Sequence, residues 1–209
     1  MVLKVLKEAM EKFPQVELFY IYYALETYGD GKLAEAETTC RKILELNPRF
    51  TRAYLILGEI EEKRGNIEKA MHLFNKALEI EPSNISLQLK YADLLVMEKQ
   101  YPQALKVYDK VLQREEVTSD PDLLFKIALL NFQFGTLQRT GELLKKAIGV
   151  EPNGKYYFTY ALVLSKKQKP GEALQNIRIA LDKYRSDLSD QQVQVAQKAV
   201  SLWSAQSNQ

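Results

Sequence analysis

The sequence predicts an all-α fold built from repeated pairs of antiparallel helices, and two observations lead to this prediction. Only 9 of the 209 residues are glycine and 7 are proline, too few for the turns of a many-stranded β fold. Residues of one type also recur 34 positions apart: Pro48 and Pro82, then Ala36, Ala70 and Ala104. A fixed period of this length is typical of a repeat array.

The clearest unit runs from Thr51 to Pro82. Each half carries apolar residues spaced to share one helical face: Tyr54, Leu57 and Ile60 in the first, and Ala70, Phe74, Ala77 and Leu78 in the second. Gly65 interrupts the helical pattern between the halves, so a turn is expected there. Gly58 and Ala70 are small where two packed helices must approach closely. Pro82 lacks an N–H and ends the second helix.

At these residues the sequence resembles the tetratricopeptide repeat (TPR) family. The resemblance implies a TPR-type right-handed α-solenoid of antiparallel helix pairs with a C-terminal capping helix. Five units are expected, and the fourth is degenerate because Thr140 stands where the others carry alanine. The expected boundaries are 1–16 for the second helix of a truncated upstream repeat, 17–50, 51–84, 85–120, 121–153 and 154–187 for the five units, and 188–205 for the capping helix.

The two ends of the array carry different signals. One repeat before Ala36, Cys40, Ile43 and Pro48 stand Val2, Leu6, Ala9 and Pro14. A repeat cannot bury its apolar face alone, so we expect the natural chain to extend upstream. At the other end Ser189 and Gln192 have the spacing of a capping box, which predicts a terminal helix.

The composition argues against several classes of function. The 29 Lys and Arg residues against 27 Asp and Glu leave a charge of only +2, so we expect no nucleic-acid partner. The single Cys and single His exclude an internal disulfide and leave too few ligands for a structural zinc site. Cys40 stands at a core position, and His72 is expected to point outward. No glycine-rich phosphate loop or distinct acid pair occurs, so we predict no metal, no cofactor and no catalysis.

The 209 residues hold no apolar run long enough for a signal peptide or a membrane span. We therefore expect them to be soluble, with the compartment left open.

The resemblance also implies a function and a binding face. In TPR proteins the first helix of each pair lines a concave face, so we expect a non-catalytic protein-protein interaction scaffold that binds a partner segment there. Four apolar residues are the expected anchors, and three lysines are expected to set the charge preference: Phe125, Leu129, Phe132 and Phe158, with Lys90, Lys126 and Lys155. Near the N-terminus the same face carries Tyr22, Leu25 and Tyr28.

Two apolar segments admit more than one interpretation. The helix from Leu18 to Leu25 is apolar all round. Its extra face either packs against an upstream repeat or a second copy, or binds a ligand. The stripe of Phe125, Leu129 and Phe132 either binds a partner or packs locally.

The sequence leaves two other functions open and disfavours two more. The array could self-associate as a structural scaffold through the Leu18–Tyr28 face, or serve as the TPR portion of a larger multidomain protein. RNA reading of the pentatricopeptide type is disfavoured, because the unit is 34 residues and the inner face carries Glu59, Asp93 and Asp122. Of the positions that grip chaperone tails in some TPR proteins, only Lys90 is retained, which disfavours that partner.

Overall fold

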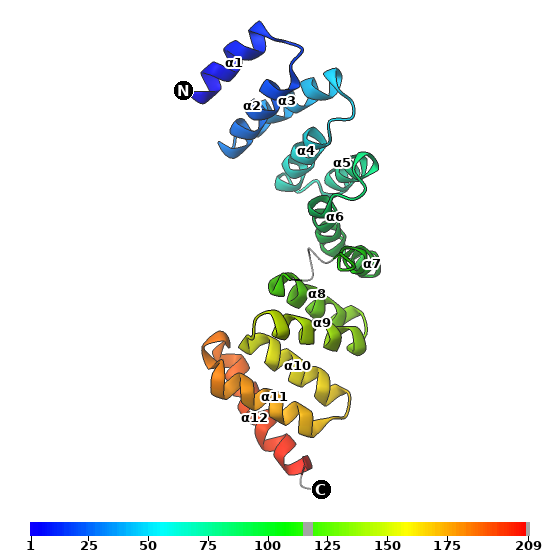
Figure 1. Cartoon of the computed structure of the whole chain (residues 1–209), viewed down its shortest axis with the longest axis vertical. Helices are drawn as coiled ribbons and strands as arrows, with labels where there is room; N and C mark the ends of the chain where they lie inside the picture. Colours follow the sequence, from blue (N-terminus) through cyan, green and yellow to red (C-terminus); the bar gives the residue numbers. More distant parts are fainter. Residues whose placement is uncertain (115–118, 208–209) are drawn as a thin grey trace. The chain divides into compact units, whose positions relative to one another are not determined.

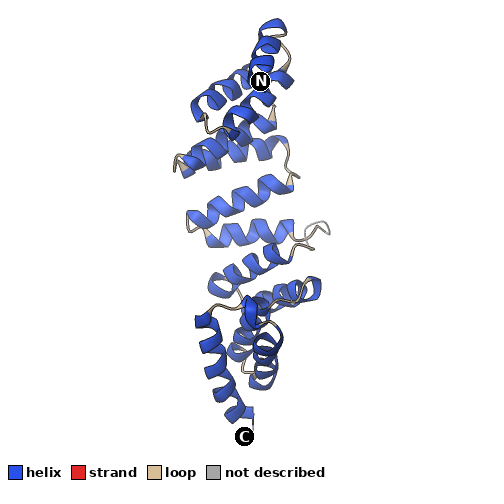
Figure 2. Cartoon of the chain, turned by 90° about the vertical axis from the view of Figure 1, so that its left-hand side faces the viewer, coloured by secondary structure: helices blue, strands red, loops and turns tan. Residues whose placement is uncertain are grey.

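The computed structural model describes residues 1–114 and 119–207, with side chains up to residue 204, and every regular element in these ranges is helical (Figure 1; Figure 2). The prediction of an all-α fold is confirmed. The elements are α1 (Val2–Lys12), α2 (Glu17–Gly29), α3 (Leu33–Leu46), α4 (Thr51–Lys63), α5 (Ile67–Ile80), α6 (Ile85–Met97), α7 (Tyr101–Val111), α8 (Pro121–Phe134), α9 (Leu137–Val150), α10 (Gly154–Lys166), α11 (Pro170–Lys183), the short 3-10 helix η2 (Arg185–Asp187) and α12 (Asp190–Ser207).

The chain divides into two compact units, Met1–Gln100 and Tyr101–Gln209. Unit 1 contains α1 to α6, with α2 packed on α3 and α4 on α5 as pairs. Unit 2 contains α7 to α12, with the pairs α8–α9 and α10–α11 followed by α12 against α11. The division falls inside the predicted third repeat, 85–120, whose exit at 115–118 lies outside the described residues.

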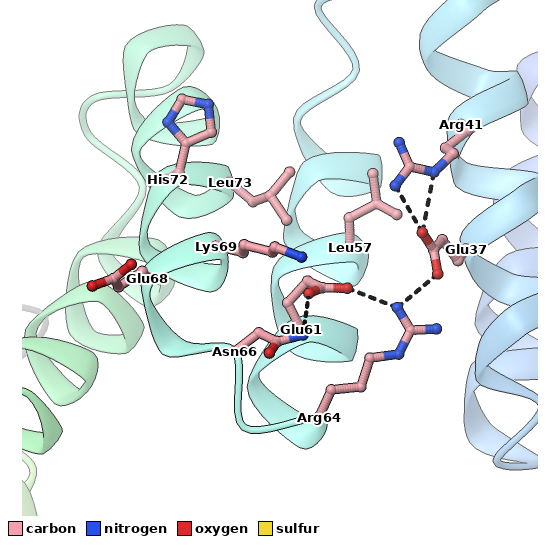
Figure 3. A pocket seen from close by; sticks show the side chains of 10 residues that line it. All are labelled: Glu37, Arg41, Leu57, Glu61, Arg64, Asn66, Glu68, Lys69, His72 and Leu73. Carbon is pink, nitrogen blue, oxygen red and sulfur yellow. Dashed lines mark hydrogen bonds and ion pairs between the residues drawn. The ribbon is translucent and has the colours of Figure 1, made fainter.

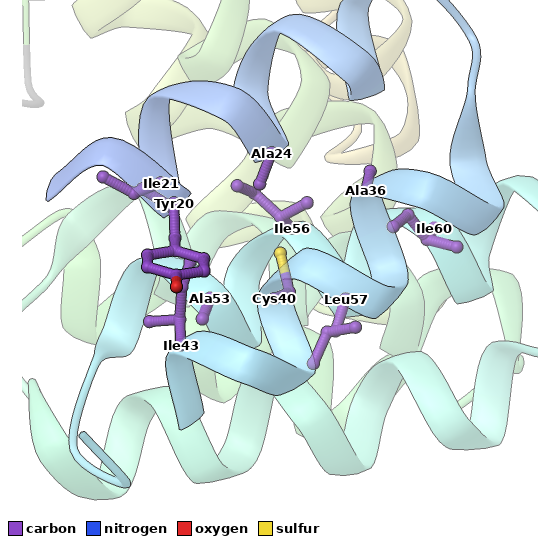
Figure 4. Close-up of a cluster of buried hydrophobic side chains, with 10 residues drawn as sticks. All are labelled: Tyr20, Ile21, Ala24, Ala36, Cys40, Ile43, Ala53, Ile56, Leu57 and Ile60. Atoms are coloured by element: carbon purple, nitrogen blue, oxygen red, sulfur yellow. The ribbon is translucent and has the colours of Figure 1, made fainter. Parts of the chain in front are cut away.

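The core of unit 1 depends on small residues where paired helices meet. Figure 4 shows α2, α3 and α4 around a cluster in which Ala24, Ala36 and Cys40 are fully buried. In the next pair Gly58 lies against the ring of Phe74, and a Cβ added to this glycine would be 2.6 Å from Phe74 Cε1. The two helices can therefore pack at this distance only because position 58 has no side chain.

A recurring hydrogen bond fixes the turn that precedes each first helix of unit 1. The Tyr20 hydroxyl donates to the Pro14 carbonyl at 3.2 Å, and Tyr54 donates to Pro48 at 3.1 Å. One repeat later the Gln88 amide Nε2 donates to the Pro82 carbonyl at 2.7 Å. Each bond spans six residues and holds the proline turn against the helix that follows it.

The turns within the pairs use left-handed backbone. Gly31 and Gly65 have φ of 76° and 78°, conformations that glycine adopts without a steric penalty. Lys99, one repeat after Gly65, has φ of 59°, and Gln168 in unit 2 has φ of 60°. The turns at Lys99 and Gln168 therefore keep the left-handed backbone without glycine, the residue that adopts it most readily.

Unit 2 shows how a degenerate repeat still folds. Thr140 is fully buried in the position of the usual alanine, and its hydroxyl donates to the Thr136 carbonyl at 2.8 Å. The polar group is thus satisfied within its own helix.

Before α12, the Ser189 N–H donates to Gln192 Oε1 at 2.9 Å and the Gln192 N–H to Ser189 Oγ at 3.3 Å, the reciprocal bonds of a capping box.

We expect Gly58→Ala to destabilise the protein by about 1–3 kcal/mol, because the fully buried Phe74 ring cannot move aside without opening the core. Urea unfolding followed by circular dichroism measures the change. Gly149→Ala is the matched control: a Cβ there meets nothing within 4 Å, so α9 should gain up to about 1 kcal/mol in stability. An unfolding midpoint for Gly58→Ala equal to that of the native chain would contradict the packing argument.

Candidate functional site

The main hollows on one face of unit 1 are formed by the first helices of successive pairs. Two adjoining cavities, of about 340 and 540 Å³, share Leu25, Thr51, Arg52 and Glu81 in their walls. Further wall residues come from α2, α4, α6 and the turns before α4 and α6: Leu18, Ile21, Tyr22, Arg49 and Phe50 in the smaller, and Tyr28, Leu55, Ile56, Glu59, Asn84 and Ser86 in the larger. We call this surface the first-helix face of unit 1.

Glu59 joins the polar groups of this face. Its Oε1 lies 2.6 Å from the Lys90 ammonium, and its carboxylate accepts a hydrogen bond from the Tyr28 hydroxyl. Burial first, and the neighbouring Glu59 charge second, raise the pKa of Tyr28 to about 12, so the phenol keeps its proton at neutral pH. The Lys63 ammonium lies 4.0 Å from the centre of the Tyr28 ring.

The apolar end of this face lies toward the N-terminus. Leu18 and Tyr22 are each 52% exposed, whereas Leu25 and Tyr28 are half-buried. Ile21 is buried, so the all-round apolar character of α2 is divided between core and surface. Of the predicted site residues in unit 1, Tyr22, Leu25 and Tyr28 line the cavities. Lys90 forms an ion pair with Glu59, which lines the larger cavity.

In unit 2 the corresponding face is formed by α8 and α10. Leu129 is 43% exposed, and Phe132 is half-buried beneath the Lys166 ammonium, 4.3 Å from the ring centre. Phe125 is half-buried, with its ring 4.8 Å from that of Tyr156.

The charged groups of this face lie on both helices. Lys126 and Lys155 are exposed, and the Lys126 ammonium is 5.8 Å from the Tyr108 ring centre. The Tyr156 hydroxyl donates to Asp122 at 2.9 Å, and burial is the main cause of its raised pKa.

The prediction of Phe158 as an accessible anchor needs correction. This side chain is only 7% exposed, because α10 packs against α9, α11 and η2 and little of its surface is left open. Helical spacing alone assigns a residue to a face but does not reveal how much neighbouring elements cover it.

Sequence reasoning left Lys63, Lys166 and Glu59 out of the binding site. The repeat pattern itself could have identified the two lysines as site residues. Each stands in the last turn of a first helix, and each lies over an aromatic ring from the preceding repeat. Glu59 is an inward-facing position of its first helix, but it is not among the predicted site residues.

A third cavity, of about 560 Å³, lies where α3, α4 and α5 meet (Figure 3). Its charged residues form a chain: Glu37 binds Arg41 and Arg64, both at 2.7 Å, and Arg64 binds Glu61 at 2.7 Å. Asn66 Nδ2 donates to Glu61 at 2.8 Å. These charged groups pair with one another across the helix pairs α2–α3 and α4–α5. The cavity therefore joins neighbouring repeats, and we call this contact the seam.

Cys40, the single cysteine of the sequence, lies in the core of unit 1. Cys40 is fully buried, and burial raises the pKa of its thiol to about 12, so the reactive thiolate is not formed at neutral pH. Across residues 1–114 and 119–207 no three His, Cys, Asp or Glu side chains gather as metal ligands would. Within the same ranges no helix combines the length and apolar content needed to span a bilayer.

Sequence comparisons give relatives with the same kind of repeat. The family model described as the tetratricopeptide repeat protein 21 C-terminal ARM domain matches residues 3–120. A TPR repeat-containing protein of Dictyostelium discoideum is 24% identical over 152 residues, covering 69% of this chain and 57% of that protein. Anaphase-promoting complex subunit 3 of Schizosaccharomyces pombe is 28% identical over 117 residues, covering 56% of this chain and 18% of that protein. Tetratricopeptide repeat protein 21A of Mus musculus is 32% identical over 98 residues, covering 44% and 7%.

Solved structures share the fold. YrrB, described as a TPR protein with an unusual peptide-binding site, superposes with a TM-score of 0.76 at 20% identity and covers 92% of this chain and 97% of its own. MamA superposes with a TM-score of 0.67 at 18% identity, covering 80% and 91%. The chain spans 57% or less of each of the three relatives named above.

The ion pairs of the seam give a pH-dependent stability. Hydrogen bonds from Arg41 and Arg64 hold the pKa of Glu37 below its ordinary value, so folding favours the ionised form. This contribution is complete above the unfolded pKa of about 4.3 and is lost as pH falls through the lower folded pKa. Thermal melts between neutral pH and pH ~3 should therefore show a steeper acid loss for the native chain than for Glu37→Gln.

Glu45→Gln is the control for this measurement, since the Glu45–Lys42 pair lies on the exposed side of one helix. It should change the acid dependence less than Glu37→Gln does. Equal slopes for the native chain and Glu37→Gln would mean that ionisation of Glu37 contributes nothing to stability.

Proposed function

The chain belongs to the tetratricopeptide repeat proteins, in the family of the tetratricopeptide repeat protein 21 C-terminal ARM domain, and from this premise we propose that it is a non-catalytic scaffold for a protein partner. A segment of the partner docks on the first-helix faces. The observation that carries the proposal is the pair of adjoining cavities on unit 1, beside side chains of Leu18 and Tyr22 that are half exposed. Apolar surface of this kind marks interaction sites on proteins.

The walls of these cavities favour a peptide over a small metabolite. They combine apolar side chains with charged groups, and they continue along the first helices instead of enclosing a single volume. A peptide in such a groove places alternate side chains in successive hollows. YrrB, which has the same fold, is itself described as having a peptide-binding site, and this analogy agrees with the proposal without identifying the partner.

In unit 2 the anchors are Leu129 and Phe132, with Phe125 supporting them through its contact with Tyr156. Lys126 and Lys155 provide positive charge along the same helices. Phe158 takes no part in this contact because it is buried.

A second candidate is self-association through the N-terminal apolar surface. Val2, Val5, Phe13, Leu18 and Tyr22 are between 47% and 58% exposed and lie within the first 22 residues. No other described segment of this length exposes as many large apolar side chains. Here the first helices would pack against a second copy and not against a foreign segment.

We expect Leu129→Asp and Tyr22→Ala each to weaken binding of a partner recovered with the native chain by about 10-fold or more, because each removes an exposed apolar contact. Affinity is measured by titration of the purified partner, with circular dichroism as the check on folding. Leu202→Asp is the control, since Leu202 is 59% exposed on α12, away from the first helices. A partner that binds both variants as tightly as the native chain uses another surface.

The mass in solution separates the two candidates. Light scattering over a concentration series should give a constant monomer of 24.1 kDa if the N-terminal surface is reserved for a foreign partner. A dimer that grows with concentration and disappears in Tyr22→Asp would instead favour self-association.

A further inference from the structure

One arrangement occurs in both units at the same repeat position. In unit 1 Lys63 of α4 lies over the Tyr28 ring of α2 at 4.0 Å, and in unit 2 Lys166 of α10 lies over the Phe132 ring of α8 at 4.3 Å. We call each a lysine-capped ring. The two arrangements stand at equivalent positions of the repeat. Phe132 follows Tyr28 by 104 residues, the same spacing that separates the aligned repeat positions Ala36 and Thr140. Lys166 follows Lys63 by 103 residues, the same spacing that separates Ala70 and Ala173.

The geometry leaves the lysines able to accept a further partner. Each ammonium lies over a half-buried ring, a contact that restricts its position without neutralising its charge. It carries three N–H donors, and neither Lys63 nor Lys166 forms an ion pair within the residues that the structure describes. Both side chains are exposed in the last turn of a first helix, on the face where we place the partner.

On the basis of the proposed function, we propose that the lysine-capped rings select acidic partner segments. A side-chain carboxylate of the segment binds the ammonium from the side opposite the ring. A neighbouring apolar side chain of the segment packs beside the ring, on Leu25 and Leu55 in unit 1 or on Leu129 and Leu162 in unit 2. The ring fixes the lysine in advance, which reduces the entropy lost when the carboxylate binds.

The two sites differ in strength for an electrostatic reason. In unit 1 Glu59 stands one turn before Lys63, bound to Lys90 and Tyr28, and its negative charge opposes an incoming carboxylate. In unit 2 the equivalent position, 103 residues later, is Leu162. The acid of this face, Asp122, lies in the first turn of α8 and accepts the Tyr156 hydroxyl, whereas Phe132 stands near the other end of that helix. Selection for acid should therefore be stronger at Lys166 than at Lys63.

The test is a selection of short random peptides displayed on phage against the folded full chain, run in parallel on Lys166→Met, Lys63→Met and Lys76→Met. Methionine keeps an unbranched apolar stem and removes the charge. Lys76 is the matched control, because its ammonium also lies near a tyrosine ring, 6.0 Å from that of Tyr54, but it belongs to the second helix α5. Thermal melts verify that each variant is folded.

The native chain and Lys76→Met should enrich peptides in which Asp or Glu adjoins a large apolar residue. Lys166→Met should lose most of the acidic preference while keeping the apolar one, because only the weaker site at Lys63 remains. Lys63→Met should lose less of it. For a selected peptide, Glu→Gln should weaken binding to the native chain by about 3-fold or more and leave binding to Lys166→Met unchanged, the coupling expected of a partly exposed ion pair.

The outcomes separate this inference from the proposed function. Apolar peptides enriched without acidic residues, or acidic enrichment as strong in both Lys166→Met and Lys63→Met as in the native chain, would overturn the lysine-capped rings as acid sites and leave docking on the first-helix faces intact. Peptides whose binding is unaffected by Leu129→Asp and Tyr22→Ala, or no enrichment at all, would overturn both.

Discussion

The close approach of the two helices in each pair is the contact on which the rest of this structure depends. Where Gly58 meets Phe74, and where Ala24 and Ala36 are buried between α2 and α3, side chains are small enough for the helices to interlock. Within unit 1 the first helices α2 and α4 also contact each other. Residues 34 positions apart then share one surface. A surface to which successive repeats of one unit contribute follows from this packing, without any one repeat providing a pocket of its own.

The charges are distributed differently on the two sides of the array. Between α3, α4 and α5 the acids and arginines satisfy one another, with Arg64 bound to both Glu37 and Glu61. On the first-helix faces, Lys63 and Lys166 are instead held over aromatic rings. A charge that is paired internally contributes to stability and is costly to recruit for binding, whereas one held over a ring keeps its donors accessible. The same residue types are therefore neutralised by ion pairs between α3, α4 and α5 and keep accessible donors on the first helices.

The sequence was sufficient for the fold, because the 34-residue period reports directly on which positions are buried. It also placed Tyr22, Leu25 and Tyr28 on a surface where cavities are found. It misjudged Phe158, whose burial depends on three neighbouring elements and not on its own helix. The hydrogen bonds from Tyr20 and Tyr54 to proline carbonyls were not predicted, since periodicity describes apolar faces and does not identify the acceptor of a side-chain hydroxyl. The division between units inside 85–120 has no compositional signal that we recognise.

Gln88 replaces the tyrosine that closes the two earlier proline turns, and this exchange has a consequence for how the chain opens. Its Nε2 keeps the bond to Pro82, but its Oε1 is buried without a partner among the described residues. An unsatisfied buried oxygen costs about 1–3 kcal/mol, which lowers the free energy of local opening around α6. In a repeat array unfolding proceeds by separation at the weakest junction. Amide protons near Gln88 should thus exchange with solvent ahead of those in α4, so that local opening of unit 1 begins at this turn.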